Sequence, residues 1–353
     1  PYYIGGVIPE RGSLLVTSPE TLRAYFDVEA RVESEVTRID RQAGQVTVHN
    51  LRTDEHYQES YDKLVLSPGA NPFVPPVPGH DLPGVFSLRN IPDMDRIVAH
   101  IEEVHPRQAV VVGGGFIGIE LAENLHHRGM SVTLVEMMNQ VLAPLDYEMA
   151  AMVHQHLRYK QIRLALGDGL KAIERIPAGD KDGLSVVLQS GRCAEAELVI
   201  LAIGVRPEYQ LAKDAGLTIG VRGTIATNVH LQTSDPDIYA IGDAAQVTHL
   251  VTGEPTNVPL AGPASKQGRL VADHIAGREV RYSGAQGTAI VKVFDLTVAT
   301  TGMNQRQLDQ AGLAYQSVIV HAANHAGYYP GAAPMAFKLL CGSEGQLYGA
   351  QIV

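Results

Sequence analysis

The sequence predicts an α/β fold built from more than one domain. At 353 residues the chain is long enough to form two or three hydrophobic cores. The continuous apolar run at residues 109–112 is typical of a strand buried on both faces of a parallel sheet. A glycine turn, an amphipathic helix and a second strand at residues 132–135 follow it, as in a βαβ unit. We therefore expect a self-contained βαβ-type domain at residues 94–221.

The segments before this domain also predict mixed α/β structure. Residues 20–25 favour a helix, and two alternating strands flank a turn at residues 42–44. A short strand at residues 64–66 ends at Ser67-Pro68-Gly69, and the proline-rich residues 72–83 predict a surface crossover.

Two further patterns follow the βαβ domain. Within residues 222–286, a strand at 237–241 ends in Gly242-Asp243 and a helix covers 262–276. Within residues 287–353, strands at 336–340 and 346–353 flank a glycine-rich turn. The sequence stops within the last strand, so we expect this domain to be incomplete.

Composition excludes several classes of protein. The net charge of −10 is spread along the chain, without a basic cluster carrying aromatic residues, which argues against nucleic acid as a partner. Cys193 and Cys341 are the two cysteines, which favours a reducing cytoplasm over a disulfide scaffold. No apolar run approaches the ~20 residues that span a bilayer, and we expect no signal peptide.

A dinucleotide fingerprint lies between the strand and the helix of the βαβ unit. Gly113 permits the tight turn, Gly115 lets backbone amides approach a pyrophosphate, and Gly118 allows close packing of helix and strand. Glu136 ends the next strand 21 residues after Gly115, where its carboxylate can accept both ribose hydroxyls. Methionines rather than arginines follow Glu136, so we expect NADH rather than NADPH. The alternative is a glycine turn in another α/β unit.

The helix after the fingerprint carries further candidates. Ile117, Leu121 and Leu125 mark one apolar face, and we also assign Ile117 to the NADH site. Phe116 and Glu120 share a face, so Phe116 can gate a nicotinamide pocket and Glu120 can contact its amide. The equally weighted alternative is a packing phenylalanine and a solvated glutamate.

A second nucleotide site is predicted around Gly242 and Asp243. A carboxylate at the C-terminal end of a strand can accept hydrogen bonds from a ribityl chain. Sixteen residues later, Pro259-Leu260-Ala261 opens a helix whose free amides suit the electron-rich end of a reduced flavin. The alternative for each of these two motifs taken alone is a capped turn.

Together these motifs resemble the FAD- and NAD-dependent pyridine nucleotide-disulfide oxidoreductases over essentially the whole chain. The motifs at residues 1–6 and 325–332 look most like the coenzyme A-disulfide and persulfide reductase branch. The resemblance implies two Rossmann-like nucleotide-binding domains, with the FAD domain (residues 1–93 and 222–286) interrupted by the NADH domain (94–221). Residues 287–353 would then be the start of a C-terminal α+β dimerisation domain, and a homodimer is implied.

The resemblance also implies roles for single residues. Asp243 binds the ribityl chain, and Leu260 and Ala261 approach the isoalloxazine. One tyrosine of the C-terminal domain reaches the thiol site of the partner subunit; Tyr328 and Tyr329 are the candidates, and since neighbours on a strand point to opposite faces, at most one does so. Ordinary packing at a dimer interface is the alternative for both. The remaining implied cofactor residues are Ser67, Pro68, Gly69, Gly242 and Pro259 for FAD, and Gly204, which like Gly69 marks a domain crossover, for NADH.

The sequence departs from the family pattern in two respects. We find neither the first glycine fingerprint, which holds the FAD pyrophosphate, nor the redox cysteine that precedes the motif at residues 1–6 in this branch. We therefore expect the chain to lack the first βαβ unit of its FAD domain. Cys193 and Cys341 match neither position, and we interpret both as structural.

The remaining histidines and Ser265 do not predict a metal site or a catalytic site. His321 and His325 are four residues apart without a third ligand, so no metal site is expected. His154 and His156 are assigned to a polar helix face, and Ser265 lacks the context of a hydrolase nucleophile.

The intact protein is therefore expected to pass hydride from NADH to FAD and electrons on to a small-molecule disulfide, persulfide or coenzyme A thiol compound. One alternative is an NADH oxidase or peroxidase. The alternative of another class is a non-catalytic nucleotide-binding fragment.

Overall fold

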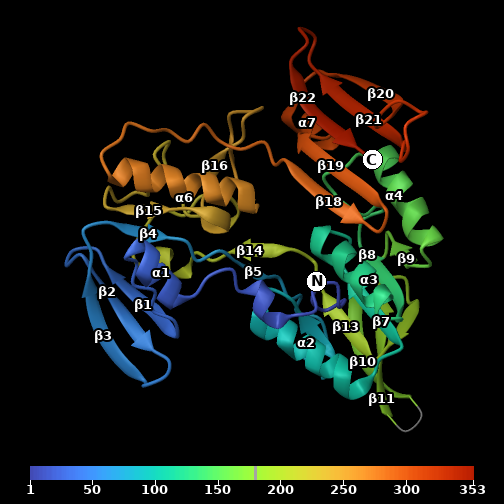
Figure 1. Cartoon of the computed structure of the whole chain (residues 1–353), viewed down its shortest axis with the longest axis horizontal. Helices are drawn as coiled ribbons and strands as arrows, with labels where there is room; N and C mark the ends of the chain where they lie inside the picture. Colours follow the sequence, from blue (N-terminus) through green and yellow to red (C-terminus); the bar gives the residue numbers. More distant parts are fainter. Residues whose placement is uncertain (179–180) are drawn as a thin grey trace. The chain divides into compact units, whose positions relative to one another are not determined.

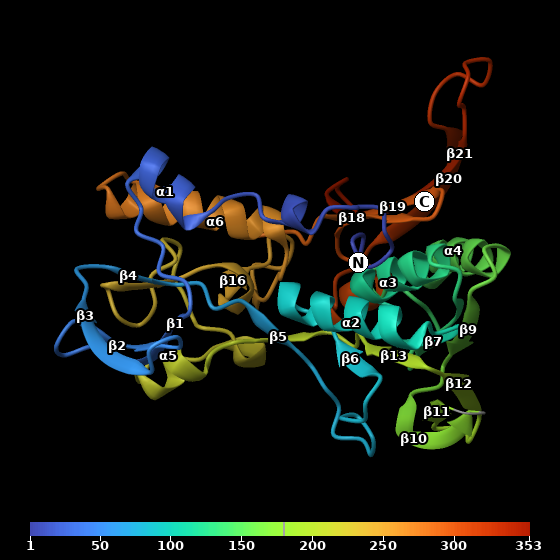
Figure 2. The same cartoon turned by 60° about the horizontal axis from the view of Figure 1, so that its bottom comes forward.

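The computed structural model describes residues 1–178 and 181–353, which form two compact units. The first unit contains Pro1–Pro9, Pro72–Val205 and Gly287–Val353, and the second contains Glu10–Asn71 and Arg206–Gln286. Both units mix helices with sheets (Figures 1 and 2), so the predicted α/β class is confirmed. None of the helices formed by these residues is long and apolar enough to cross a lipid bilayer.

A five-stranded parallel sheet forms the centre of the first unit, in the order β6-β13-β7-β8-β9. Its central strands β7 and β13 are buried along almost their whole length, as their apolar sequences predict. The strands are β6 (Val85–Ser87), β7 (Gln108–Val112), β8 (Ser131–Glu136), β9 (Arg163–Leu166) and β13 (Leu198–Leu201). Three helices precede or connect them: α2 (Ile91–Val104), α3 (Phe116–His127) and α4 (Tyr147–Tyr159). A small antiparallel sheet is made of β10 (Leu170–Ala178), β11 (Lys181–Leu188) and β12 (Cys193–Ala196).

Two predictions about helix faces are wrong. Ile117 is 41% exposed, whereas Leu121 and Leu125 are buried. A row of residues four apart drifts by about 40° at each step around a helix, so its first member leaves the buried face. His154 lies buried in α4 instead of on a polar face. It follows buried Ala150 by four residues and precedes buried Leu157 by three, a spacing that places it on the apolar face.

The C-terminal part of the first unit is an antiparallel sheet in the order β18-β19-β22-β21-β20. Its strands β21 and β22 pair around the predicted turn, so this hairpin is confirmed. Strand β20 forms an edge, and every residue in it is exposed. The elements are β18 (Ala289–Val293), β19 (Leu296–Gly302), α7 (Gln305–Ala311), β20 (Gln316–Ala323), β21 (Pro334–Cys341) and β22 (Leu347–Ile352).

The second unit is assembled from two segments that are distant in sequence. Strands β4 and β15 pair in parallel, and Leu66 and Ile238 share one core with Val46 of the neighbouring antiparallel sheet. The strands are β1 (Ser34–Asp40), β2 (Gln45–Asn50), β3 (Glu55–Ser60), β4 (Leu64–Leu66) and β15 (Ile238–Ala240). The helices are α1 (Pro19–Phe26), α5 (Gln210–Asp214) and α6 (Ala261–Ile275). The short pieces are β16 (Val247–Thr248), β17 (Pro255–Thr256), η1 (Arg11–Leu14), η2 (Val221–Gly223) and η3 (Gly242–Ala244). Two further short strands, β5 (Ala70–Pro72) and β14 (Val205–Pro207), include residues of both units.

Candidate functional site

The glycine turn between β7 and α3 is shaped by backbone packing that tolerates no side chain at two positions. Gly113 has φ +114°, and a Cβ there would lie well inside 3.0 Å of the Ala202 carbonyl. A Cβ at Gly118 would meet the carbonyl of Gly113 equally closely. At Gly115, in contrast, no atom lies within 4 Å of where a Cβ would stand. Gly115 is the N-cap of α3 and offers no side-chain acceptor, so the free amides of the first turn suit an anion.

Glu136 stands beside this turn at the end of β8. Its carboxylate accepts hydrogen bonds from the backbone N–H of Gly114 at 2.7 Å and of Met138 at 2.8 Å. These two bonds fix the side chain next to the glycines, and each carboxylate oxygen keeps further acceptor capacity for ribose hydroxyls. The turn and the glutamate therefore fit a nicotinamide dinucleotide without a 2′-phosphate.

Phe116 and Glu120 are both half-buried on the first turns of α3. The hydroxyl of Tyr2 donates to Oε1 of Glu120 at 3.5 Å, and burial is the main cause of a raised pKa at this carboxyl. Glu120 is thus not a plainly solvated residue, and its contact to nicotinamide stays a prediction. Tyr2 was missed because its partner is distant in sequence. Gly204, with φ +104°, accepts a hydrogen bond from the N–H of Phe73.

In the second unit, the parallel strands β4 and β15 end side by side, so the predicted flavin residues that follow them lie close together. Ser67 follows β4, and its Oγ would lie 3.6 Å from a Cβ at Gly242, which follows β15. The N–H of Gly242 donates at 2.6 Å to Oε1 of Gln267, a buried residue of α6. Gln267 carried no sequence signal, because a polar residue within a helix predicts no particular partner. Beyond Ser67 and Pro68, Gly69 has φ +74° and its carbonyl accepts from the N–H of Glu208.

Asp243 and the start of α6 supply acceptor and donor groups beside this cluster. Burial raises the pKa of Asp243, and among the described residues its carboxylate has no hydrogen-bond partner. A partly buried carboxylate without a partner suits a ligand that brings hydroxyl donors. The N-cap of α6 is Leu260, which has no side-chain acceptor, and Pro259 and Ala261 beside it are exposed. The helix therefore presents free amides, and these residues fit the predicted flavin.

Comparison with known proteins identifies the family. The sequence model of the pyridine nucleotide-disulphide oxidoreductases matches residues 8–268. The chain belongs to this family.

Three similar proteins bear the names of two reductases and one oxidase. The crystal structure of reduced CoADR-RHD from Bacillus anthracis is 51% identical, has a TM-score of 0.96, and is matched by 100% of this chain over 63% of its own. A NAD-dependent persulfide reductase from A. fulgidus is 35% identical, with a TM-score of 0.95 over 100% of this chain and 66% of its own. An NADH oxidase from Methanocaldococcus jannaschii is 35% identical over 100% of this chain and 78% of its own length. The predicted family and branch are confirmed, and the chain spans less than two thirds of either solved structure.

The two candidate tyrosines of this oxidoreductase do not lie on a strand, contrary to the prediction. Tyr328 and Tyr329 are in the turn between β20 and β21, and they are 91% and 61% exposed. The argument from opposite strand faces therefore does not apply to them. The ring of Tyr329 packs edge-on against His325 at a centroid distance of 5.2 Å. Both tyrosines remain candidates for contact with a ligand or a partner.

The two cysteines lie apart from each other and both are free. Cys193 is exposed at the start of β12, where it lines a pocket together with Arg163 and Arg192. Cys341 ends β21 and is half-buried. Both belong to the first unit, and the residues assigned to flavin around Asp243 belong to the second.

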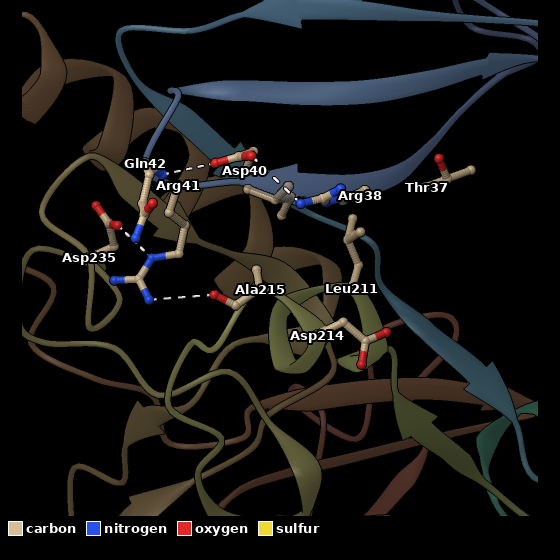
Figure 3. A pocket seen from close by; sticks show the side chains of 10 residues that line it. Thr37, Arg38, Asp40, Arg41, Gln42, Leu211, Asp214, Ala215 and Asp235 are labelled. Atoms are coloured by element: carbon tan, nitrogen blue, oxygen red, sulfur yellow. Dashed lines mark hydrogen bonds and ion pairs between the residues drawn. The ribbon is translucent and has the colours of Figure 1, made fainter.

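A separate polar pocket of about 500 Å³ in the second unit contains none of the predicted flavin residues. Figure 3 shows Arg41 reaching from the β1–β2 turn towards Asp235 and the carbonyl of Ala215. Its Nε donates to Asp235 at 2.7 Å, and Nη1 donates to the carbonyls of Ala215 and Gly216 at 3.4 and 3.2 Å. Arg41 therefore joins the two sequence segments of this unit, a structural role.

Proposed function

We propose that the chain is part of a flavin-dependent enzyme that uses NADH to reduce a small-molecule disulfide or persulfide. The observation that carries this proposal is the pair of sites described above. One is a dinucleotide turn with an acidic ribose acceptor, and the other is a cluster of Ser67, Gly242 and Asp243 next to the free end of α6. Family membership implies FAD and a nicotinamide dinucleotide as the cofactors, and bound FAD supplies a two-electron acceptor for the hydride of NADH.

The residues of the chain bind and orient the two cofactors. The first-turn amides of α3 hold the pyrophosphate of NADH, while Glu136 accepts its ribose hydroxyls and disfavours a 2′-phosphate. Phe116 and Glu120 border the nicotinamide. Asp243 accepts the ribityl hydroxyls of FAD, and the amides around Leu260 and Ala261 stabilise negative charge on its pyrimidine ring. Positioning accounts for most of the acceleration.

A coenzyme A disulfide or persulfide is the substrate class we favour, since a CoADR-RHD and a persulfide reductase are among the solved structures that share this fold. We assign the thiol step to neither Cys193 nor Cys341. A second candidate function is NADH oxidation with dioxygen or peroxide, which the 35% identity to an NADH oxidase favours.

We further propose a homodimer formed through the C-terminal sheet. Edge strand β20 carries Val318, Ile319 and Val320, all substantially exposed. The turn that contains Tyr328 and Tyr329 follows this strand. An exposed apolar edge strand is a ready surface for association. A cytoplasmic location is proposed on the two free cysteines.

Colour and acceptor preference test the proposal. The full-length protein should bind FAD, and NADH should bleach the bound flavin under anaerobic conditions; a colourless full-length protein that takes up no added FAD would overturn the proposal. Flavin uptake by the 353-residue chain alone would refute the alternative of a non-catalytic nucleotide-binding fragment. With the full-length protein, NADH consumption should be supported by coenzyme A disulfide or persulfide; turnover with dioxygen alone would select the oxidase instead.

A further inference from the structure

The segment that connects β8 with α4, residues 137–146, packs directly against the glycine turn. The N–H of Leu142 donates to the carbonyl of Gly114 at 2.8 Å. A Cβ at Gly114 would lie only 3.0 Å from Cγ1 of Val141, so this side of the turn is already filled. Val141 and Leu142 are both fully buried. The conformation of residues 137–146 therefore determines where the backbone of Gly114 stands.

The other end of this segment is held by the C-terminal sheet, which lies beside α4 (Figures 1 and 2). Asp146 forms an ion pair with Lys338 of β21 at 2.7 Å, and the Lys338 side chain is 0% exposed. Asp146 also accepts from the backbone N–H of Gln305 at 2.9 Å and from Nε2 of Gln351 at 2.8 Å. Gln351 in turn accepts from the N–H of Asp146 at 2.7 Å. Glu148 and Gln305 complete the acceptors around the Lys338 ammonium.

Asn304 forms hydrogen bonds with the middle of segment 137–146. Its Nδ2 donates to the carbonyl of Ala143 at 3.0 Å and to that of Pro144 at 3.2 Å. Its Oδ1 separately accepts from the N–H of Gln307 and caps α7. The Asn304 side chain thus binds the C-terminal domain through its oxygen and residues 137–146 through its nitrogen, and it links this domain to the segment that packs against Gly114.

The segment needs these external contacts to keep its shape. Leu142 has φ +51°, a conformation that a branched side chain adopts only when its surroundings impose it. Removing one partner of a buried lysine–aspartate pair leaves an unpaired buried charge, so the cluster disfavours arrangements of the segment that separate Asp146 from Lys338. Changes in the C-terminal domain are therefore transmitted to Gly114 through defined hydrogen bonds.

We propose that Lys338, Asp146 and Asn304 are positioning residues that set the affinity for NADH by fixing residues 137–146 against Gly114. Docking of the C-terminal domain is then part of the NADH site and acts through residues 137–146. This inference rests on the proposed function of the glycine turn and extends it to a distant domain.

The decisive variant is Asn304→Ser. Serine retains an acceptor for the cap of α7 but removes the donor to Ala143 and Pro144. Losing two hydrogen bonds to the segment should raise the Kd and KM for NADH roughly fivefold, while kcat at saturating NADH changes less than about twofold. Lys338→Met should act in the same direction. The matched control is Lys160→Met, which breaks the ion pair between Lys160, the C-cap of α4, and Asp295 in the β18–β19 turn of the same C-terminal sheet, away from the contacts of Asn304 and Asp146.

The measurements are NADH titration, steady-state kinetics and the thermal unfolding midpoint for the FAD-loaded protein. A raised Kd in Asn304→Ser with unchanged affinity in Lys160→Met supports the proposal. A lowered midpoint in Asn304→Ser with wild-type affinity overturns it and leaves a purely structural role. Because Asn304→Ser leaves the buried charges paired, the test stands even if Lys338→Met does not fold. If the wild-type protein itself binds no NADH, the proposed function fails together with this inference; wild-type binding with unaltered variants refutes only the inference.

Discussion

Replacing Gly115 and Gly118 separately by alanine distinguishes a ligand-binding glycine from a packing glycine. The added methyl at Gly118 would overlap the carbonyl oxygen of Gly113, which is backbone and cannot rotate away. Overpacking of this kind costs about 1–3 kcal/mol of unfolding free energy. The methyl at Gly115 meets no atom within 4 Å, and its φ of −77° is open to any residue.

Gly115→Ala should therefore change the unfolding free energy by less than about 1 kcal/mol, because the small loss in N-cap preference is offset by a stiffer unfolded chain. Its effect should appear only with the ligand. The methyl occupies space where the pyrophosphate approaches the amides of α3, so we expect the Kd for NADH to rise at least about tenfold, equivalent to roughly 1.4 kcal/mol.

Denaturant unfolding and NADH titration of both variants provide the assay. Gly118→Ala should lose stability first, and Gly115→Ala should lose binding alone. Wild-type NADH affinity in a fully stable Gly115→Ala protein would refute the assignment of this turn to the pyrophosphate.

Three further predictions concern single side chains. Glu136→Gln removes the charge that disfavours a 2′-phosphate, so the ratio of kcat/KM for NADPH to that for NADH should rise by about tenfold or more; an unchanged ratio would show that Glu136 does not read the ribose. Asp243→Asn should lower the FAD content of purified protein, measured from its visible absorbance, whereas Asp214→Asn at an exposed position should not; equal flavin content in both would contradict the ribityl role. Burial lowers the pKa of His154 below its ordinary 6.5, and its Nε2 accepts from the N–H of Val141 at 3.1 Å. Because the pKa of His154 is lowered in the folded state, the stability contributed by its neutral ring is present above pH 6.5 and is lost as the pH falls through the folded-state pKa. His154→Gln should therefore flatten the acid side of the plot of unfolding free energy against pH. Superimposable plots for the variant and the wild type would exclude His154 as the cause.

Much of the fold could be predicted because its signals are local. The apolar run at β7, the glycines before α3 and the alternation in β21 and β22 each reflect a short stretch of backbone. Ile117 and His154 show the limit of such reasoning, since a helical position is buried or exposed according to what packs on it. The turn that carries Tyr328 was likewise assigned to a strand.

The cluster that we propose as the flavin site was predicted in part. Ser67, Gly242 and Asp243 lie together as expected, because parallel strands present their carboxyl ends at one edge. The hydrogen bond from the N–H of Gly242 to Gln267 could not be predicted from the sequence. Its role exists only once α6 packs next to the end of β15.

By itself the sequence predicted the glycine turn and its acidic neighbour, since only glycine tolerates the close backbone approach at Gly113 and Gly118 and a carboxylate can accept two ribose hydroxyls. The tertiary structure alone decided the pairing of Lys338 with Asp146 and the tether from Asn304 to the segment beside Gly114. These residues lie more than 150 positions apart, and the partner of a buried polar group depends on which distant elements exclude water around it. No local pattern encodes that choice, because burial is a property of the packed chain.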